Sequence, residues 1–190
     1  MDYRNKTERI VVHHSASSPN TTMEQVNEWH KNLGWGMIGY HYFIEYDGTV
    51  KDGRPDWAVG AHAIGANYDA LGICLAGNFE EALPSREQIV SLAATIEDIR
   101  RAYGNIPYIG HNEVDPVNYP TACPGALFPW NELNQLLRRE AVVLNIDEAI
   151  AILQEKGIIT SQASADYWKG AVPYYPYIDA LIINMAKAIK

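Results

Sequence analysis

The sequence predicts an α/β fold in which helices flank a central mixed β-sheet, with a small all-helical appendage at the carboxyl end. Residues 9–14 form an apolar, β-branched run that is typical of a buried strand. Further strand patterns alternate with helix patterns up to about residue 140, and a tight turn at Asp47-Gly48 predicts one antiparallel hairpin within the sheet. Beyond residue 141 only helix patterns remain. We therefore expect two parts, residues 1–140 and residues 141–190.

The first strand pattern ends in two histidines. Alternation along a regular strand places Val11 and His13 on one face and Val12 and His14 on the other, so only one histidine of the pair can enter a given site. The next element is a helix that Thr22 caps and Gly34 ends. Its inner stripe includes His30, which we interpret as an amphipathic surface histidine.

The rest of the first part continues the alternation. Residues 40–46 and 49–51 are the two strands of the hairpin, and residues 71–76 form another buried strand that contains Cys74. A long amphipathic helix begins at residues 84–87 and ends near Gly104, and a short strand at residues 106–109 leads to His111. Residues 130–139 form the last helix of this part.

The second part reads as helices around residues 145–157, 163–169 and 178–189. A segment of about 50 residues can bury only a small core, so we expect it to pack against another surface. That surface is the first part, a second copy of the chain in a homodimer, or a ligand in the target.

The composition argues against several classes of function. The formal net charge is -8, from 15 basic and 23 acidic residues, and no basic cluster stands out, which argues against nucleic acid as a partner. No apolar run approaches the roughly 20 residues of a membrane helix. Two cysteines argue against a disulfide framework. The polar amino terminus does not resemble a signal peptide, so we expect synthesis in the cytoplasm and a separate route to any extracellular target.

One loop carries the candidate chemistry. His111 and Cys123 lie twelve positions apart in a stretch rich in proline and asparagine. Imidazole and thiolate are zinc ligands, and a catalytic zinc needs three protein ligands and one open position, where the pKa of water falls to about 7. The third ligand is expected from the His13-His14 pair. A four-ligand structural zinc, completed by His14 or His41, is the alternative.

Four segments make a more specific pattern: IVVHHSAS, GWGMIGYHYFIEYDGTV, VGAHAIGANYDALGICLAGNF and GHNEVDPVNYPTACPG, in this order. Together they resemble the zinc-dependent N-acetylmuramoyl-L-alanine amidases, which include phage lysozyme-type amidases and peptidoglycan recognition proteins. The resemblance implies one zinc ion per chain, held by His13, His111 and Cys123. It also implies hydrolysis of the amide bond between N-acetylmuramic acid and L-alanine in peptidoglycan, with lysis of the cell wall.

The resemblance also suggests roles for other residues. Tyr40 would handle the proton near the metal, Thr121 would hydrogen-bond the tetrahedral intermediate, and His62 would line the substrate cleft. Wall-recycling members of the family carry glutamate where this chain has Cys74, and they end the ligand set with aspartate instead of Cys123. Both differences place the chain with the lytic branch, most simply as a phage or prophage endolysin. A cytosolic recycling amidase and a non-catalytic peptidoglycan receptor are the alternatives, and receptors typically lack the cysteine ligand.

Overall fold

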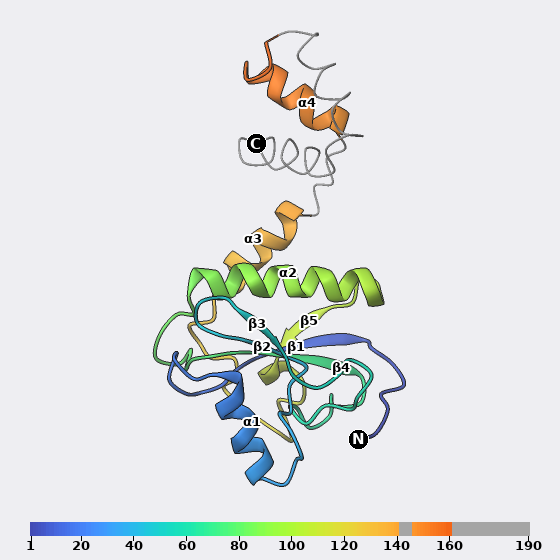
Figure 1. Cartoon of the computed structure of the whole chain (residues 1–190), viewed down its shortest axis with the longest axis vertical. Helices are drawn as coiled ribbons and strands as arrows, with labels where there is room; N and C mark the ends of the chain where they lie inside the picture. Colours follow the sequence, from blue (N-terminus) through green and yellow to red (C-terminus); the bar gives the residue numbers. More distant parts are fainter. Residues whose placement is uncertain (141–145, 161–190) are drawn as a thin grey trace. The chain divides into compact units, whose positions relative to one another are not determined.

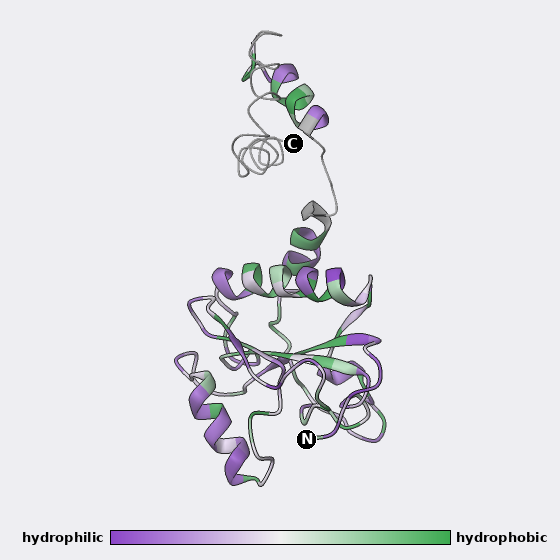
Figure 2. Cartoon of the chain, turned by 45° about the vertical axis from the view of Figure 1, so that its right-hand side comes forward, coloured by the Kyte–Doolittle hydropathy of each residue, from purple (hydrophilic) through white to green (hydrophobic). Residues whose placement is uncertain are grey.

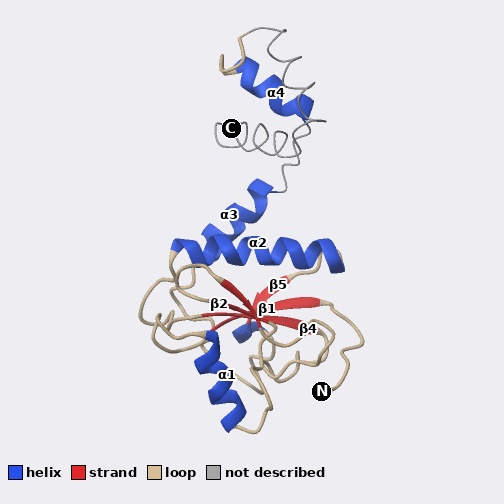
Figure 3. Ribbon diagram, in the orientation of Figure 1, coloured by secondary structure: helices blue, strands red, loops and turns tan. Residues whose placement is uncertain are grey.

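The computed structural model describes residues 1–140 and 146–160. The chain divides into two compact units, Met1–Leu137 and Arg138–Lys190. The first unit has a sheet with a long helix on one side and a shorter helix on the other (Figures 1 and 3). The predicted α/β class is therefore confirmed.

The sheet has five strands in the order β3-β2-β4-β1-β5. Four of them are parallel, and only β3 pairs antiparallel, with β2, so the sheet is mixed as predicted. The strands are β1 (Arg9–His14), β2 (Tyr42–Ile44), β3 (Val50–Asp52), β4 (Ala70–Leu75) and β5 (Tyr108–Gly110). Because the parallel strands share a direction, β1, β4 and β5 end at the same edge, where His13 is in register with Cys74.

The helices begin at the residues that the sequence marks. α1 (Met23–Asn32) starts with a capping box between Thr22 and Gln25, and α2 (Arg86–Tyr103) starts with one between Ser85 and Gln88. A short 3₁₀ helix, η1 (His111–Glu113), follows β5, and α3 (Trp130–Glu140) contains the last residues of the first unit. α1 is mostly hydrophilic along its length (Figure 2) and buries only Val26.

The two faces of the sheet carry different cores. The larger core lies between the sheet and α2 and includes Ile10 and Val12 of β1 and Leu133 of α3. Val11 points to the other face, into a smaller cluster with Ala63, Ala66 and Ala70. The predicted alternation along β1 therefore holds.

In the second unit the structure describes one helix, α4 (Ile146–Glu155), which buries Ala149, Ile150 and Leu153 as its sequence pattern predicts. Gly157, with φ of 70°, follows the helix end. The helices predicted around residues 163–169 and 178–189 lie outside the described residues. Among the residues that are described, no helix combines the length and apolarity needed to cross a membrane.

Candidate metal centre and active site

Three elements bring the predicted ligands to one edge of the sheet. His13 is the next-to-last residue of β1, and His111 is the first residue of η1, directly after β5. Cys123 lies in the loop that leads to α3. Its carbonyl accepts the N–H of Asn112 at 2.8 Å, which ties the two halves of the His111–Cys123 loop together. His111 and Cys123 follow His13 by 98 and 110 positions in the sequence. They lie next to it because β1 and β5 are neighbouring strands.

The geometry of these three side chains fits a shared metal ion. One ligand atom from each of His13, His111 and Cys123 lies within 4.8 Å of the others. The Cys123 Sγ is 3.7 Å from His13 Nδ1. Zinc bonds of about 2.0 Å to nitrogen and 2.3 Å to sulfur, at tetrahedral angles, put such atoms roughly 3.3–3.6 Å apart. The spacing of the His13 and Cys123 donors is therefore close to that of two zinc ligands, and the three donors are of the kinds that zinc takes.

Burial controls the charges of the three ligands. It lowers the pKa of His13 strongly, with smaller effects from the neighbouring His62 and His111, and it lowers the pKa of His111. Burial also raises the pKa of the Cys123 thiol to about 12. The metal-free site consequently holds two neutral imidazoles and a thiol at neutral pH. A cation is the partner that would stabilise the thiolate there.

The other two histidines proposed as a fourth ligand make different contacts. His14 accepts the Phe79 N–H at its Nδ1 (3.0 Å), and its ring lies against the Phe79 ring. His41 accepts the Gly72 N–H at its Nδ1 (3.0 Å), and its Nε2 is 3.1 Å from the Ala58 carbonyl. Among the described residues, the cluster with metal-ligand geometry contains three side chains.

Tyr40 lies next to the ligands, just before β2. Its ring centroid is 5.1 Å from that of His13. Burial raises its pKa well above the usual value for tyrosine, and the nearby Cys74 and Cys123 add to this effect. Tyr40 therefore keeps its proton at neutral pH and offers its hydroxyl as a hydrogen-bond donor.

Thr121 lines the cleft together with His111. Its Oγ1 accepts the N–H of Cys123 at 3.2 Å. Because this bond uses a lone pair and not the hydroxyl proton, the Thr121 O–H is free to donate into the cleft.

His62 is a buried residue that also contacts a predicted metal ligand. It does line the cleft, but only 8% of it is exposed, and its Nδ1 is 3.0 Å from His13 Nε2. No local pattern in the sequence indicates this contact, because it joins residues 49 positions apart. The prediction that His62 lines the substrate cleft therefore did not include its contact with His13.

The cleft itself has a volume of about 510 Å³ and opens beside His111. Its rim includes exposed apolar groups on Trp35 (44% exposed) and Tyr119 (49% exposed). Tyr119 was not predicted as a site residue, although its position two residues before Thr121 was a signal in the sequence. The lining residues are Trp35, Ala61, His62, Ala63, Ile64, Asn67, His111, Tyr119, Pro120 and Thr121.

Other aromatic residues and His30 have structural contacts. Phe79 is buried in the core, and Trp57 stacks on Tyr3 with ring centroids 4.6 Å apart. His30 differs from the predicted surface histidine because its Nδ1 accepts the Gly39 N–H at 2.9 Å and its ring packs against Trp35 and Tyr40. It thereby braces the loop that carries Tyr40.

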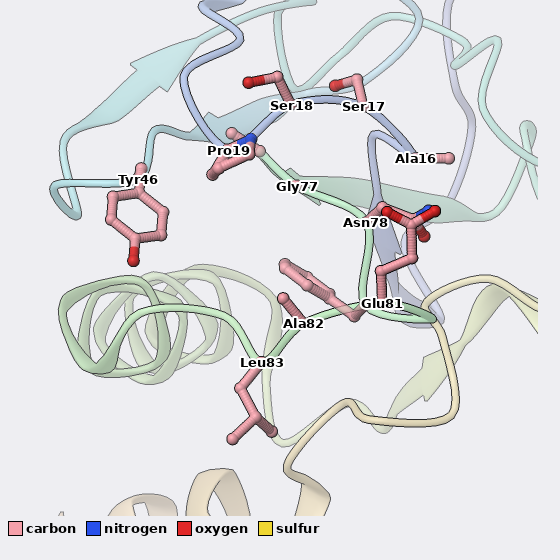
Figure 4. A pocket seen from close by; sticks show the side chains of 12 residues that line it. Ala16, Ser17, Ser18, Pro19, Tyr46, Gly77, Asn78, Glu81, Ala82 and Leu83 are labelled. Atoms are coloured by element: carbon pink, nitrogen blue, oxygen red, sulfur yellow. The ribbon is translucent and has the colours of Figure 1, made fainter.

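A second hollow, of about 360 Å³, lies between the loop after β1 and the loop after β4 (Figure 4). Ser17, Ser18 and Pro19 line one side, and Asn78 and Leu83 lie on the other. None of the predicted metal ligands lines it, and neither do Tyr40, His62 and Thr121.

Two imidazoles and a thiol lie around one point, beside a protonated phenol and an open cleft. This arrangement is that of a hydrolase site whose three donors could hold one metal ion. The family model described as N-acetylmuramoyl-L-alanine amidase matches residues 3–126. The endolysin of Escherichia phage T7 is 37% identical over 142 residues, which cover 70% of this chain and 91% of the endolysin. The chain belongs to the N-acetylmuramoyl-L-alanine amidase family.

Two further relatives support this membership. Peptidoglycan-recognition protein SC2 of Drosophila melanogaster is 32% identical over 134 residues, covering 65% of this chain and 70% of that protein. The solved structure of the N-acetylmuramoyl-L-alanine amidase LysC from Clostridium intestinale URNW has 38% sequence identity and a TM-score of 0.66. That match covers 72% of this chain and 89% of LysC.

Proposed function

We propose that this chain is a lytic peptidoglycan amidase that cuts the amide bond between N-acetylmuramic acid and L-alanine, with one zinc ion held by His13, His111 and Cys123. The observation that carries the proposal is the ligand cluster, with its three donor atoms within 4.8 Å of one another beside an open cleft. The cleft suits a peptide attached to a sugar, because apolar groups line most of it and a few polar groups converge at one end. The retained thiol of Cys123 disfavours the alternative of a non-catalytic receptor.

The side chains around the scissile bond have different proposed roles. When bound, zinc would polarise the carbonyl oxygen and activate water for attack. Thr121 donates a hydrogen bond to the oxygen that gains negative charge. Tyr40 keeps its proton until the leaving nitrogen of L-alanine requires one, and so acts as the proton-handling residue. Buried His13 and Cys123 hold the inner side of the site, and His111 faces the cleft.

A digestion of purified peptidoglycan tests this function. The expected products are new amino-terminal L-alanine groups without new reducing ends. A chelator should abolish the activity and added zinc should restore it. His111→Ala should lose both activity and zinc, whereas His14→Ala, the matched control at the neighbouring position of β1, should keep its zinc. New reducing ends, or full zinc occupancy in His111→Ala, would overturn the proposal.

For residues 141–190 we propose a role in wall affinity, through direct contact or through pairing of two copies. Residues 1–140 carry 11 basic and 18 acidic groups, whereas residues 141–190 carry 4 and 5. An acidic catalytic part is repelled by an anionic wall, so lysis of whole cells after release needs a further source of affinity. The segment is rich in aromatic residues at Tyr167, Trp168, Tyr174, Tyr175 and Tyr177.

A truncated protein that ends at Glu140 tests this role. It should still cleave solubilised peptidoglycan fragments but clear whole cells poorly. Sedimentation of the full chain and the truncated protein distinguishes pairing from direct contact. If the truncated protein is insoluble, or inactive on both substrates, the segment is part of the catalytic fold and the affinity role is wrong.

A further inference from the structure

We infer that His62 is a positioning residue that fixes which nitrogen of His13 faces the metal. The inference rests on the proposed zinc centre and goes beyond it, because His62 is not a ligand. It lies behind His13, on the side of the ring away from Cys123. Its role is to hold a proton on His13 Nε2, so that Nδ1 stays free as the ligand atom.

The two nitrogens of His13 have different neighbours. Nδ1 is 3.7 Å from Cys123 Sγ, and Nε2 is 3.0 Å from His62 Nδ1. A neutral imidazole carries one proton, and the nitrogen that binds a metal cannot carry it. Because Nδ1 faces the thiol, the proton of His13 belongs on Nε2, and His62 Nδ1 must accept it.

The ring of His62 is held in a slot formed by two glycines. A Cβ atom at Gly60 would lie 2.5 Å from the His62 ring, and one at Gly72 would lie 2.6 Å from it. Gly72 is in the middle of β4, where its N–H also donates to His41. The absence of side chains at these two positions leaves the space that the His62 imidazole occupies.

The other nitrogen of His62 indicates that stability does not explain this residue. Nε2 is buried and has no hydrogen-bond partner of normal distance and angle in the described part of the chain. A buried, unpaired N–H destabilises the folded protein. An apolar side chain would avoid that cost, but it could not accept the His13 proton. Metal-binding histidines usually donate their second N–H to a carboxylate, a carbonyl or water, and here a neutral imidazole takes that place.

Paired substitutions in the full chain test the inference. His62→Asn keeps an acceptor oxygen near the position of Nδ1, whereas His62→Leu has a similar size and no acceptor. Zinc dissociation constants, measured by competition with a fluorescent chelator, should be about 10- to 100-fold weaker for His62→Leu, the usual effect of losing such a partner. His62→Asn should stay within about threefold of the unsubstituted protein. The absorption spectrum of the cobalt-substituted protein should change in His62→Leu and be restored in His62→Asn.

The melting temperature of the zinc-free proteins separates positioning from folding. If His62→Leu does not fold, His62→Ala replaces it, with the same expectation for zinc. The inference is overturned if a folded variant without an acceptor binds zinc as tightly as the unsubstituted protein, or if His62→Asn loses as much affinity as His62→Leu. If the unsubstituted protein binds no zinc, the proposed metal centre itself is wrong, which is a different outcome.

Discussion

Adding one methyl group at Gly72 should destabilise the fold through the His62 ring. In Gly72→Ala the new Cβ would lie 2.6 Å from two ring carbons and 2.8 Å from Nδ1 of His62. The backbone of Gly60 lies near the other part of the ring, since a Cβ added there would be 2.5 Å from it, and this limits how far the ring can shift. Overpacking of this kind costs about 1–3 kcal/mol, or roughly 3–12 °C in the melting temperature of a unit of this size.

A double-mutant cycle on zinc-free protein isolates the cause. The free energy of unfolding, from urea titrations of all four proteins, gives the coupling between the two positions. In a His62→Ala background the ring is gone, so Gly72→Ala should cost less than about 0.5 kcal/mol. An equal cost in both backgrounds would refute the reasoning, because the strain would then come from the β4 backbone and not from the ring.

Three further predictions concern the reaction and the metal. Tyr40→Phe should bind zinc normally but lose about 10²- to 10⁴-fold in turnover, measured as release of L-alanine amino termini. If its turnover stays within a few-fold of that of the unsubstituted protein, another residue handles the proton. Thr121→Val should lose less, because one donor to the oxygen is removed while zinc affinity stays the same, and an unchanged rate would contradict its role. The apparent zinc affinity should rise about tenfold per pH unit from pH 6.5 to 8.5. The pKa of Cys123 is raised to about 12, so its thiol must lose one proton when zinc binds. The two imidazoles are already neutral and release no proton. Chelator competition at three pH values checks this slope, which Cys123→Ser should flatten; a slope near two would mean that a histidine is protonated in the metal-free site.

Local patterns in the sequence were enough to predict most of the fold. The β-branched run of β1 and the capping residues Thr22 and Ser85 act within a few positions, so their effects can be read directly. Alternation along β1 also separated His13 from His14, because side chains of a strand point to opposite faces in turn.

Contacts between distant segments were harder to predict. β2 is shorter than the predicted strand over residues 40–46. Next to its start, the buried Arg54 donates to the carbonyls of Ile38, Val59 and Trp35. Arginine is usually exposed, so nothing local indicates this arrangement. The contact between His62 and His13 likewise depends on a slot between two glycines from different segments.

The strand order has a consequence for when the site comes into being. β1, the first strand in the chain, lies between β4 and β5, which are both synthesised later. A chain in which β5 has not yet docked lacks two of the three ligands, since His111 and Cys123 both follow that strand. Such long-range parallel pairing forms slowly compared with local contacts. A zinc ion bound at the proposed site would therefore stabilise the sheet with β5 in place, by an amount that grows with the free zinc concentration. Any local opening that releases β5 would disassemble the catalytic centre before the rest of the domain unfolds.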